Sequence, residues 1–122
     1  MARPPTTAKG QRAEVLAARY LQDRGYRLVT TNFRCRRGEI DIIAEDGDVL
    51  CFVEVRSRAN AALGHPLETV GMAKQARLIR AARYYLATHR GCADRFTRFD
   101  VVGIVYRPRL DIRLVQGAFE AG

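Results

Sequence analysis

Charged and β-branched residues alternate in two neighbouring segments of the chain, a pattern typical of β-strands with one apolar and one polar face. The first segment is Gly38–Asp41, and the second is Glu54–Arg56, thirteen residues after Asp41. A turn signal, Asp46-Gly47, lies between them, so we expect a β-hairpin with strands near 39–44 and 49–57. The polar face of this hairpin would bring together four charged side chains, those of Glu39, Asp41, Glu54 and Arg56.

The remaining hydrophobic pattern predicts two helices and three further strands. The first helix should run to about Asp23, with Thr6 or Thr7 as its N-cap and Gly25 as its C-cap. The other expected elements are strands over 26–30, 99–106 and 110–115 and a helix over 70–89. The apolar positions of that second helix are Met72, Ala76, Ile79, Ala82 and Leu86.

Two stretches predict loops, a basic one over 32–38 and another over 59–66. The resulting order, α-β-β-β-α-β-β, predicts a mixed sheet with helices packed on it. A chain of 122 residues is long enough for one core and too short for two. We therefore expect a flexible N-terminal arm over 1–6 and a single domain over 7–122.

The charge of the chain indicates a polyanionic partner. There are 21 basic and 13 acidic residues, which give a net charge of +8, and only Lys9 and Lys74 are lysines. Arginine's planar guanidinium suits bidentate contact with phosphate, so nucleic acid is the expected partner. The alternative is an ordinary soluble protein from an arginine-rich proteome.

The cysteines and the hydropathy indicate a cytoplasmic protein without a membrane segment. Cys35, Cys51 and Cys92 are odd in number and widely spaced, so they predict neither a disulfide framework nor a zinc site. Cys51 lies in an apolar run and is expected in the core. Reduced thiols fit the cytoplasm, and no run approaches the ~18 apolar residues of a membrane span.

The acidic residues predict a metal site. Glu14 shares a helical face with Ala17, Ala18 and Leu21, so its carboxylate should point toward the sheet, where it needs a metal, a proton or a partner. Together with the hairpin acids, it offers oxygen ligands, which favour Mg²⁺ or Mn²⁺ over zinc. Two alternatives stay open: an edge glutamate that reaches water, and an ordinary amphipathic hairpin.

Arginines flank these acids and are candidates for phosphate contacts. They are Arg34, Arg36, Arg37, Arg58, Arg77, Arg80 and Arg83. Those of the second helix recur every three residues, and a solvated helix face is the alternative for each one. Gln75 leans toward the apolar side of that helix, and Lys74 borders the same face.

The chain resembles the YraN-type family of small bacterial proteins, which is similar to Holliday-junction resolvases and the PD-(D/E)xK nuclease superfamily. The residues that carry the resemblance are Glu14, Gly38–Asp41, Phe52–Arg58, Gly64–Pro66, Lys74, Ala82, Tyr85–Leu86 and Arg98–Val101. The resemblance spans about residues 10 to 119. It implies an α/β fold with a restriction-endonuclease-like αβββαβ core, a mixed β-sheet flanked by helices.

The resemblance also implies roles for particular residues. Asp41 and Glu54 correspond to the metal-binding acids and Glu14 to the helical acid, while Arg56 stands where the motif has lysine. Arginine stays protonated, so it can orient water or stabilise charge but cannot act as a general base. Glu39 would support the metal shell, and Lys74 or Gln75 would assist from the second helix.

Three interpretations follow from the sequence. The first is a Mg²⁺- or Mn²⁺-dependent endonuclease that hydrolyses phosphodiester bonds, in branched DNA by analogy with the resolvases, and as a homodimer by the same analogy. The second is a catalytically inactive nucleic-acid-binding protein on the same fold. The third is an adaptor whose basic surface binds acidic proteins.

Overall fold

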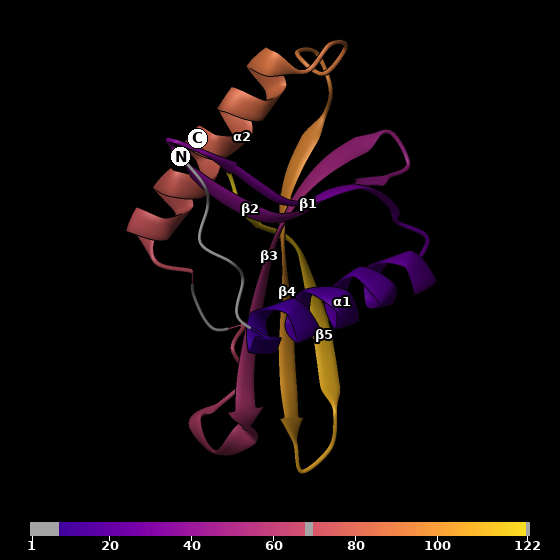
Figure 1. Cartoon of the computed structure of the whole chain (residues 1–122), viewed down its shortest axis with the longest axis vertical. Helices are drawn as coiled ribbons and strands as arrows, with labels where there is room; N and C mark the ends of the chain where they lie inside the picture. The colour runs from indigo at the N-terminus through magenta and orange to yellow at the C-terminus, as the bar shows by residue number, and fades with distance from the viewer. Residues whose placement is uncertain (1–7, 68–69, 122) are drawn as a thin grey trace.

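The computed structural model describes residues 8–67 and 70–121, and within them the chain forms two α-helices, one short 3₁₀ helix and five strands (Figure 1). The helices are α1 (Ala8–Asp23), η1 (Ala61–Leu63) and α2 (Met72–Thr88). The strands are β1 (Arg27–Cys35), β2 (Gly38–Asp46), β3 (Val49–Asn60), β4 (Thr97–Arg107) and β5 (Asp111–Phe119). The predicted arm over 1–6 and the predicted N-cap at Thr6 or Thr7 lie outside the described residues.

The five strands form one mixed sheet in the order β1-β2-β3-β4-β5. β1, β2 and β3 pair antiparallel, α2 crosses over so that β4 lies parallel to β3, and β5 pairs antiparallel with β4. This arrangement confirms the predicted αβββαβ core, to which β5 adds an edge strand. Within residues 8–67 and 70–121, none of the helices combines the length and apolar character needed to cross a bilayer.

The end of α1 confirms the predicted glycine C-cap. Gly25 has φ = +93°, a conformation that glycine adopts without steric cost. Its N–H donates to the Gln22 carbonyl, and the N–H of Tyr26 donates to the Leu21 carbonyl, which is the Schellman pattern. The chain therefore reverses at Gly25 and enters β1 with Tyr26 buried under the helix.

The hairpin of β2 and β3 is confirmed, whereas the predicted basic loop before it is wrong. Residues 32–35 belong to β1, and only Arg36 and Arg37 form the turn to β2. Phe33 pairs with Ile40, so ladder hydrogen bonds extend the strand through a stretch whose composition had indicated a loop. β5 is likewise longer than predicted and reaches Phe119.

Both faces of the sheet are covered, which corrects the prediction of one apolar and one charged face. Ile42, Ala44 and Val53 pack with Ala17 and Leu21 of α1. On the opposite face the core side chains come from three strands and α2, namely Ile40, Ile43, Leu50, Phe52, Phe99, Leu78, Ala81, Ala82 and Tyr85. Ile40 and Ile42 thus belong to different cores.

The buried face of α2 confirms the predicted one only in part, because Ala82 is buried while Ile79 and Leu86 lie at the edge of the core. Leu78, Ala81, Ala82 and Tyr85 are buried, whereas Met72 is 85% exposed. The buried residues keep the helical spacing of three and four. Most of them, however, lie one residue before the predicted apolar positions. This rotation turns Lys74 toward the sheet, because it lies one helical turn before Leu78.

Candidate functional site

Asp41 and Glu54 lie side by side at one end of the β2–β3 hairpin. Their neighbours Ile42 and Val53 are paired in register, so the two acids occupy adjacent positions on neighbouring strands. Asp41 accepts a hydrogen bond of 2.8 Å from the backbone N–H of Val55. Both acids line a pocket of about 350 Å³, which we call the acidic pocket. Its other lining residues are Arg34, Cys35, Gly38, Glu39, Lys74, Arg77 and Leu78.

The surroundings of Asp41 disfavour its charged form. Burial, followed by the negative charge of Glu54 and then that of Glu14, raises the pKa of Asp41 to about 7. The Val55 N–H and the Lys74 ammonium act in the opposite direction without cancelling this effect. A carboxylate with this pKa exchanges protons near neutral pH, which is frequent at functional sites.

Glu54 is the most deeply buried acid of the pocket and is paired with Lys74. Its side chain is 5% exposed, and the Lys74 Nζ lies 2.6 Å from its Oε1. Lys74 therefore reaches the site predicted for it from the first turn of α2. Gln75 does not line the acidic pocket, because its Nε2 donates to the Val70 carbonyl at 2.7 Å and ties the side chain to the segment before the helix.

Glu14 approaches the same acids from the other face of the sheet. It lines a second pocket, of about 210 Å³, which shares Arg34, Glu39 and Asp41 with the acidic pocket. The Nδ2 of Asn32 donates to Glu14 Oε2 at 2.7 Å. Asn32 has φ = +54°, which asparagine tolerates better than most residues. The sequence pattern had indicated a loop at Asn32, and no spacing along the chain predicts this contact.

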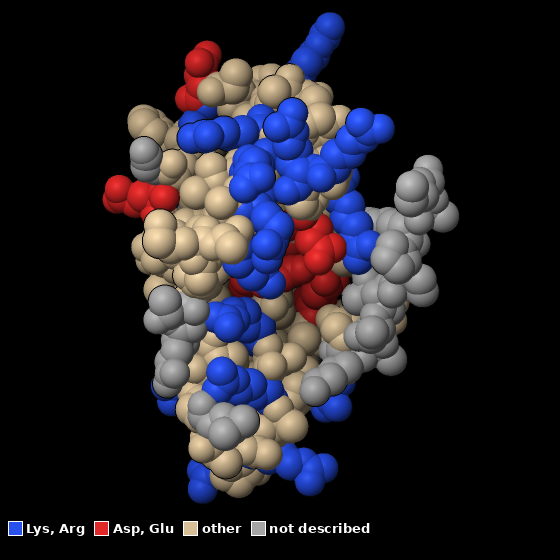
Figure 2. Space-filling view, turned by 90° about the vertical axis from the view of Figure 1, so that its left-hand side faces the viewer, with Lys and Arg blue, Asp and Glu red and all other residues tan. Residues whose placement is uncertain are grey.

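The basic residues predicted to contact phosphate divide into two groups. Arg34 and Arg77 line the acidic pocket, and the exposed Arg36, Arg37, Arg80 and Arg83 continue from it along the β1–β2 turn and α2. Arg34 also pairs with Glu39 at 2.9 Å. Figure 2 shows carboxylates recessed between Lys and Arg side chains on this face. This surface combines acidic groups at its centre with a basic surround.

The second group lies further along β3. Arg58 donates to the Gly64 carbonyl at 3.3 Å, so its guanidinium is directed toward η1. Arg56 is half-buried opposite Gly103 of β4 and is not among the residues lining the acidic pocket. The sequence pattern placed Arg56 on the face of Glu54, which its spacing of two residues along β3 supports.

Two carboxylates of the acidic pocket, those of Asp41 and Glu54, are potential ligands for a hard divalent cation. Asp41 and Glu54 supply oxygen ligands of the kind that Mg²⁺ and Mn²⁺ prefer. The pKa of Asp41 is raised first by burial and then by the negative charge of Glu54, and a cation would offset that charge. In the conformation shown, Lys74 supplies the positive charge next to Glu54. Within residues 8–67 and 70–121, no three His, Cys, Asp or Glu side chains are close enough together to hold a metal ion.

Gly38 allows β2 to approach α2 closely at the edge of the acidic pocket. A Cβ at this position would lie 3.0 Å from the Arg77 carbonyl oxygen, and the φ of Gly38 is +154°. Both the contact and the backbone angle therefore exclude a larger residue without local movement. Because Arg77 and Lys74 belong to the same helix, this contact also sets how near Lys74 lies to Glu54.

We expect Gly38→Ala to lower the free energy of unfolding by about 1–3 kcal/mol, since it adds backbone strain and a close contact with α2. Chemical denaturation followed by circular dichroism measures this loss. Gly47→Ala is the matched control, because Gly47 has φ = +58° but open space around its Cβ position. Equal losses in the two variants would show that the contact with α2 contributes nothing.

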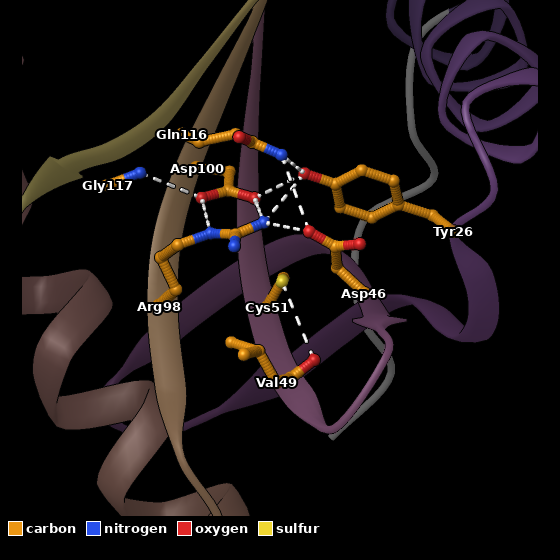
Figure 3. A network of polar contacts seen from close by, with 8 residues as sticks. All are labelled: Tyr26, Asp46, Val49, Cys51, Arg98, Asp100, Gln116 and Gly117. Carbon is orange, nitrogen blue, oxygen red and sulfur yellow. Dashed lines mark hydrogen bonds and ion pairs between the residues drawn. The ribbon is translucent and has the colours of Figure 1, made fainter.

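A second polar cluster, at the other end of the hairpin, joins three strands and the connection between α1 and β1 (Figure 3). Arg98 donates to both oxygens of the buried Asp100, at 2.8 and 2.9 Å, and also to Asp46 at 2.9 Å. The Tyr26 hydroxyl donates to Asp100 and accepts from Arg98, each at 2.8 Å. Gln116 completes the cluster by donating to the Tyr26 hydroxyl at 2.9 Å.

This cluster is suited to stabilising the fold, because its hydrogen bonds join residues of β2, β4 and β5. Gly117 N–H also donates to Asp100, so both carboxylate oxygens of this buried acid are well supplied with donors. Burial raises the pKa values of Tyr26 and Cys51 to about 12, so both groups stay protonated at neutral pH. Cys51 is buried in the core as predicted. The spacing of two residues between Arg98 and Asp100 along β4 was a sequence signal for this pairing.

Comparison with known proteins assigns a family. The model of the family described as "Uncharacterised protein family UPF0102" matches residues 13–104. A UPF0102 protein of Chromohalobacter salexigens is 50% identical over 114 residues, which cover 93% of this chain and 91% of the relative. A UPF0102 protein of Marinobacter nauticus is 43% identical over 123 residues and covers 99% of each chain. One of Nitrosococcus oceani is 51% identical over 96 residues, 79% of this chain and 77% of the relative.

Proposed function

The chain belongs to UPF0102, the YraN-type family, and we propose that it is a metal-dependent endonuclease that hydrolyses phosphodiester bonds in DNA. The observation that carries the proposal is the acidic pocket, in which Asp41 and the buried Glu54 lie side by side within a surround of arginines. Acids at the centre suit a divalent cation, and the basic surround suits the phosphates of a nucleic acid.

The residues of the pocket can be given separate tasks. Asp41 and Glu54 would hold Mg²⁺ or Mn²⁺, with Glu14 and Glu39 supporting them. A bound divalent ion supplies a water of lowered pKa and stabilises charge on the phosphate. Lys74, drawn toward Glu54, would turn its ammonium to a phosphate oxygen once the acid binds a cation. Arg56 would add a fixed positive charge on the same face, since it cannot accept a proton.

A basic binding surface should make DNA affinity depend steeply on salt. If four arginines each neutralise one phosphate, the logarithm of the duplex affinity should fall by roughly 4 for each tenfold rise in salt. Replacing both Arg77 and Arg80 with alanine should reduce this slope by about 2. Arg19→Ala, on the exposed side of α1, is the control and should leave the slope unchanged. Fluorescence anisotropy at several salt concentrations measures these slopes, and a flat wild-type response would exclude DNA as the partner.

The second candidate is a DNA-binding protein without nuclease activity. Two observations favour it: the ion pair of 2.6 Å that Lys74 already makes with Glu54, and arginine at position 56 in place of the motif lysine. In this case the arginines around the acidic pocket bind phosphate. Asp41 and Glu54 then have a structural role and bind no metal. Both candidates predict DNA binding, and only the first predicts cleavage.

Cleavage of labelled linear, flapped and four-way DNA in Mn²⁺ or in EDTA tests the proposal. We expect products with wild type in Mn²⁺, and none with EDTA, Asp41→Asn or Glu54→Gln. Asp111→Asn is the control, because Asp111 lies on β5 and is not among the residues lining the acidic pocket. Binding without cleavage in every condition would favour the second candidate. Cleavage by Asp41→Asn or Glu54→Gln at the wild-type rate would refute the assigned site.

Compartment and assembly are part of the same proposal. Cys35, Cys51 and Cys92 are free thiols, which supports a reducing compartment such as the cytoplasm. A homodimer is proposed by analogy with resolvases, in which a two-fold axis matches a symmetric junction. Light scattering at several protein concentrations, with and without four-way DNA, tests this assembly.

A further inference from the structure

An aromatic cluster between β1 and α2 leaves one tyrosine ring at the surface. Phe33 of β1 lies between two tyrosines of α2, with ring centroids 6.4 Å from Tyr84 and 5.2 Å from Tyr85. Tyr85 is buried, whereas Tyr84 is 45% exposed. Phe33 thus supports Tyr84 from the sheet side. The sequence showed only scattered aromatic residues, because Phe33 and Tyr84 are far apart along the chain.

Tyr84 belongs to the same exposed flank of α2 as two arginines. Arg80 is four residues before it and Arg77 seven residues before it, so the three side chains follow one another along the helix surface. All three residues are exposed, and Arg77 also lines the acidic pocket. In Figure 2, Lys and Arg side chains continue away from the recessed carboxylates on this face. The row therefore leads from the acidic pocket to an exposed aromatic ring.

An aromatic ring at the end of a row of cations has the chemistry of a single-strand binding surface. Bases stack on aromatic side chains in any sequence, while basic groups follow the phosphates of the strand. In a continuous duplex the base faces are already stacked on each other, so the Tyr84 ring could contact only the backbone. An unpaired base, by contrast, offers its face to the ring.

We propose that Tyr84 stacks against an unpaired base of a DNA strand whose phosphates lie along Arg80 and Arg77. This inference rests on the proposed function and gives its substrate class: DNA with a single-stranded segment beside the cleaved bond. Lys74 and Tyr84 are ten residues apart on α2, about 15 Å along the helix axis. At 3.4 Å per stacked nucleotide, the stacked base lies roughly four nucleotides from the phosphate in the acidic pocket.

Binding of a 12-nucleotide DNA strand that carries one 2-aminopurine tests the proposal, because the fluorescence of this base is quenched when it stacks. With Ca²⁺ in place of Mn²⁺ to avoid cleavage, we expect wild type to bind and to quench the fluorescence. Tyr84→Ala should bind about tenfold more weakly and lose the quenching, while Tyr84→Phe should keep both. A blunt hairpin duplex should show less than a twofold difference between wild type and Tyr84→Ala.

Tyr20→Ala is the matched control, since Tyr20 is a tyrosine of α1, on the opposite face of the sheet, and carries Arg24 over its ring at 4.3 Å. It should bind the strand as wild type does. If Tyr84→Ala binds and quenches like wild type, the stacking proposal is wrong while the nuclease proposal stands. If wild type binds neither strand nor duplex, both proposals are wrong. An equal loss of strand and duplex affinity in Tyr84→Ala would also refute stacking.

Discussion

Arg98→Ala is expected to lower the free energy of unfolding by about 3–5 kcal/mol, because it leaves a buried carboxylate without its positive partner. Asp100 is 1% exposed and receives two hydrogen bonds from Arg98. The remaining donors, Tyr26 and Gly117, satisfy its oxygens in part without neutralising its charge. Urea denaturation followed by far-ultraviolet circular dichroism measures the loss, since the chain has no tryptophan.

Arg113→Ala is the matched control for this prediction. Arg113 also pairs with an aspartate two residues away, at 3.0 Å from Asp111, but both side chains are largely exposed. A surface pair of this kind contributes about 0–1 kcal/mol. Similar losses in Arg98→Ala and Arg113→Ala would contradict the structural role assigned to the buried cluster.

Asp41→Asn is expected to make the metal-free protein more stable above neutral pH, by up to roughly 4 kcal/mol. The folded state raises the pKa of Asp41 from 3.8 to about 7, so between these values the folded chain binds a proton that the unfolded chain has released. The stability that this group contributes is therefore complete below about pH 4 and is lost as the pH rises through 7. Asparagine carries no charge and keeps an oxygen that can accept the Val55 N–H.

Denaturation of both proteins between pH 4 and pH 8 in EDTA measures this difference, which should grow with pH and level off above 7. Addition of Mn²⁺ at pH 8 should raise the melting temperature of wild type and have little effect on Asp41→Asn. Glu39→Gln is the control for the pH profile in EDTA alone, because it removes a charge at the pocket rim from a side chain that is 59% exposed. Parallel pH profiles for wild type and Asp41→Asn would show that Asp41 titrates normally in the folded protein.

Local patterns in the sequence predicted most elements of the fold. A hairpin with its turn after Asp46 followed from alternation with a period of two, and the end of α1 followed from Gly25, since only short-range backbone geometry is involved. The prediction failed where pairing with β2 decided the structure against the composition. Residues 32–35, part of the predicted basic loop, extend β1 instead. The continuous apolar run Leu50–Val53 is typical of a strand that is covered on both faces. The alternation of the following residues, Glu54–Arg56, favoured the incorrect prediction of one apolar and one charged face.

The candidate site was predictable in part for the same reason. Asp41 and Glu54 meet because hairpin register is set by the turn and by the apolar residues beside them. Lys74 joins them only because α2 packs with Leu78 and Tyr85 inward, a rotation that the apolar stripe predicted imperfectly. Gln75, one residue later, turns back to the Val70 carbonyl and leaves the pocket.

Spacing within short segments, together with composition, is enough to predict the helices, the central hairpin, the net positive charge and the meeting of Asp41 with Glu54. Contacts between distant segments arise only from the packing of the folded chain. Tyr26 meets Gln116 across ninety residues, and Phe33 supports Tyr84 across the gap between sheet and helix. Such contacts depend on how helices and strands pack around two cores. They cannot be predicted from the spacing of side chains along the chain.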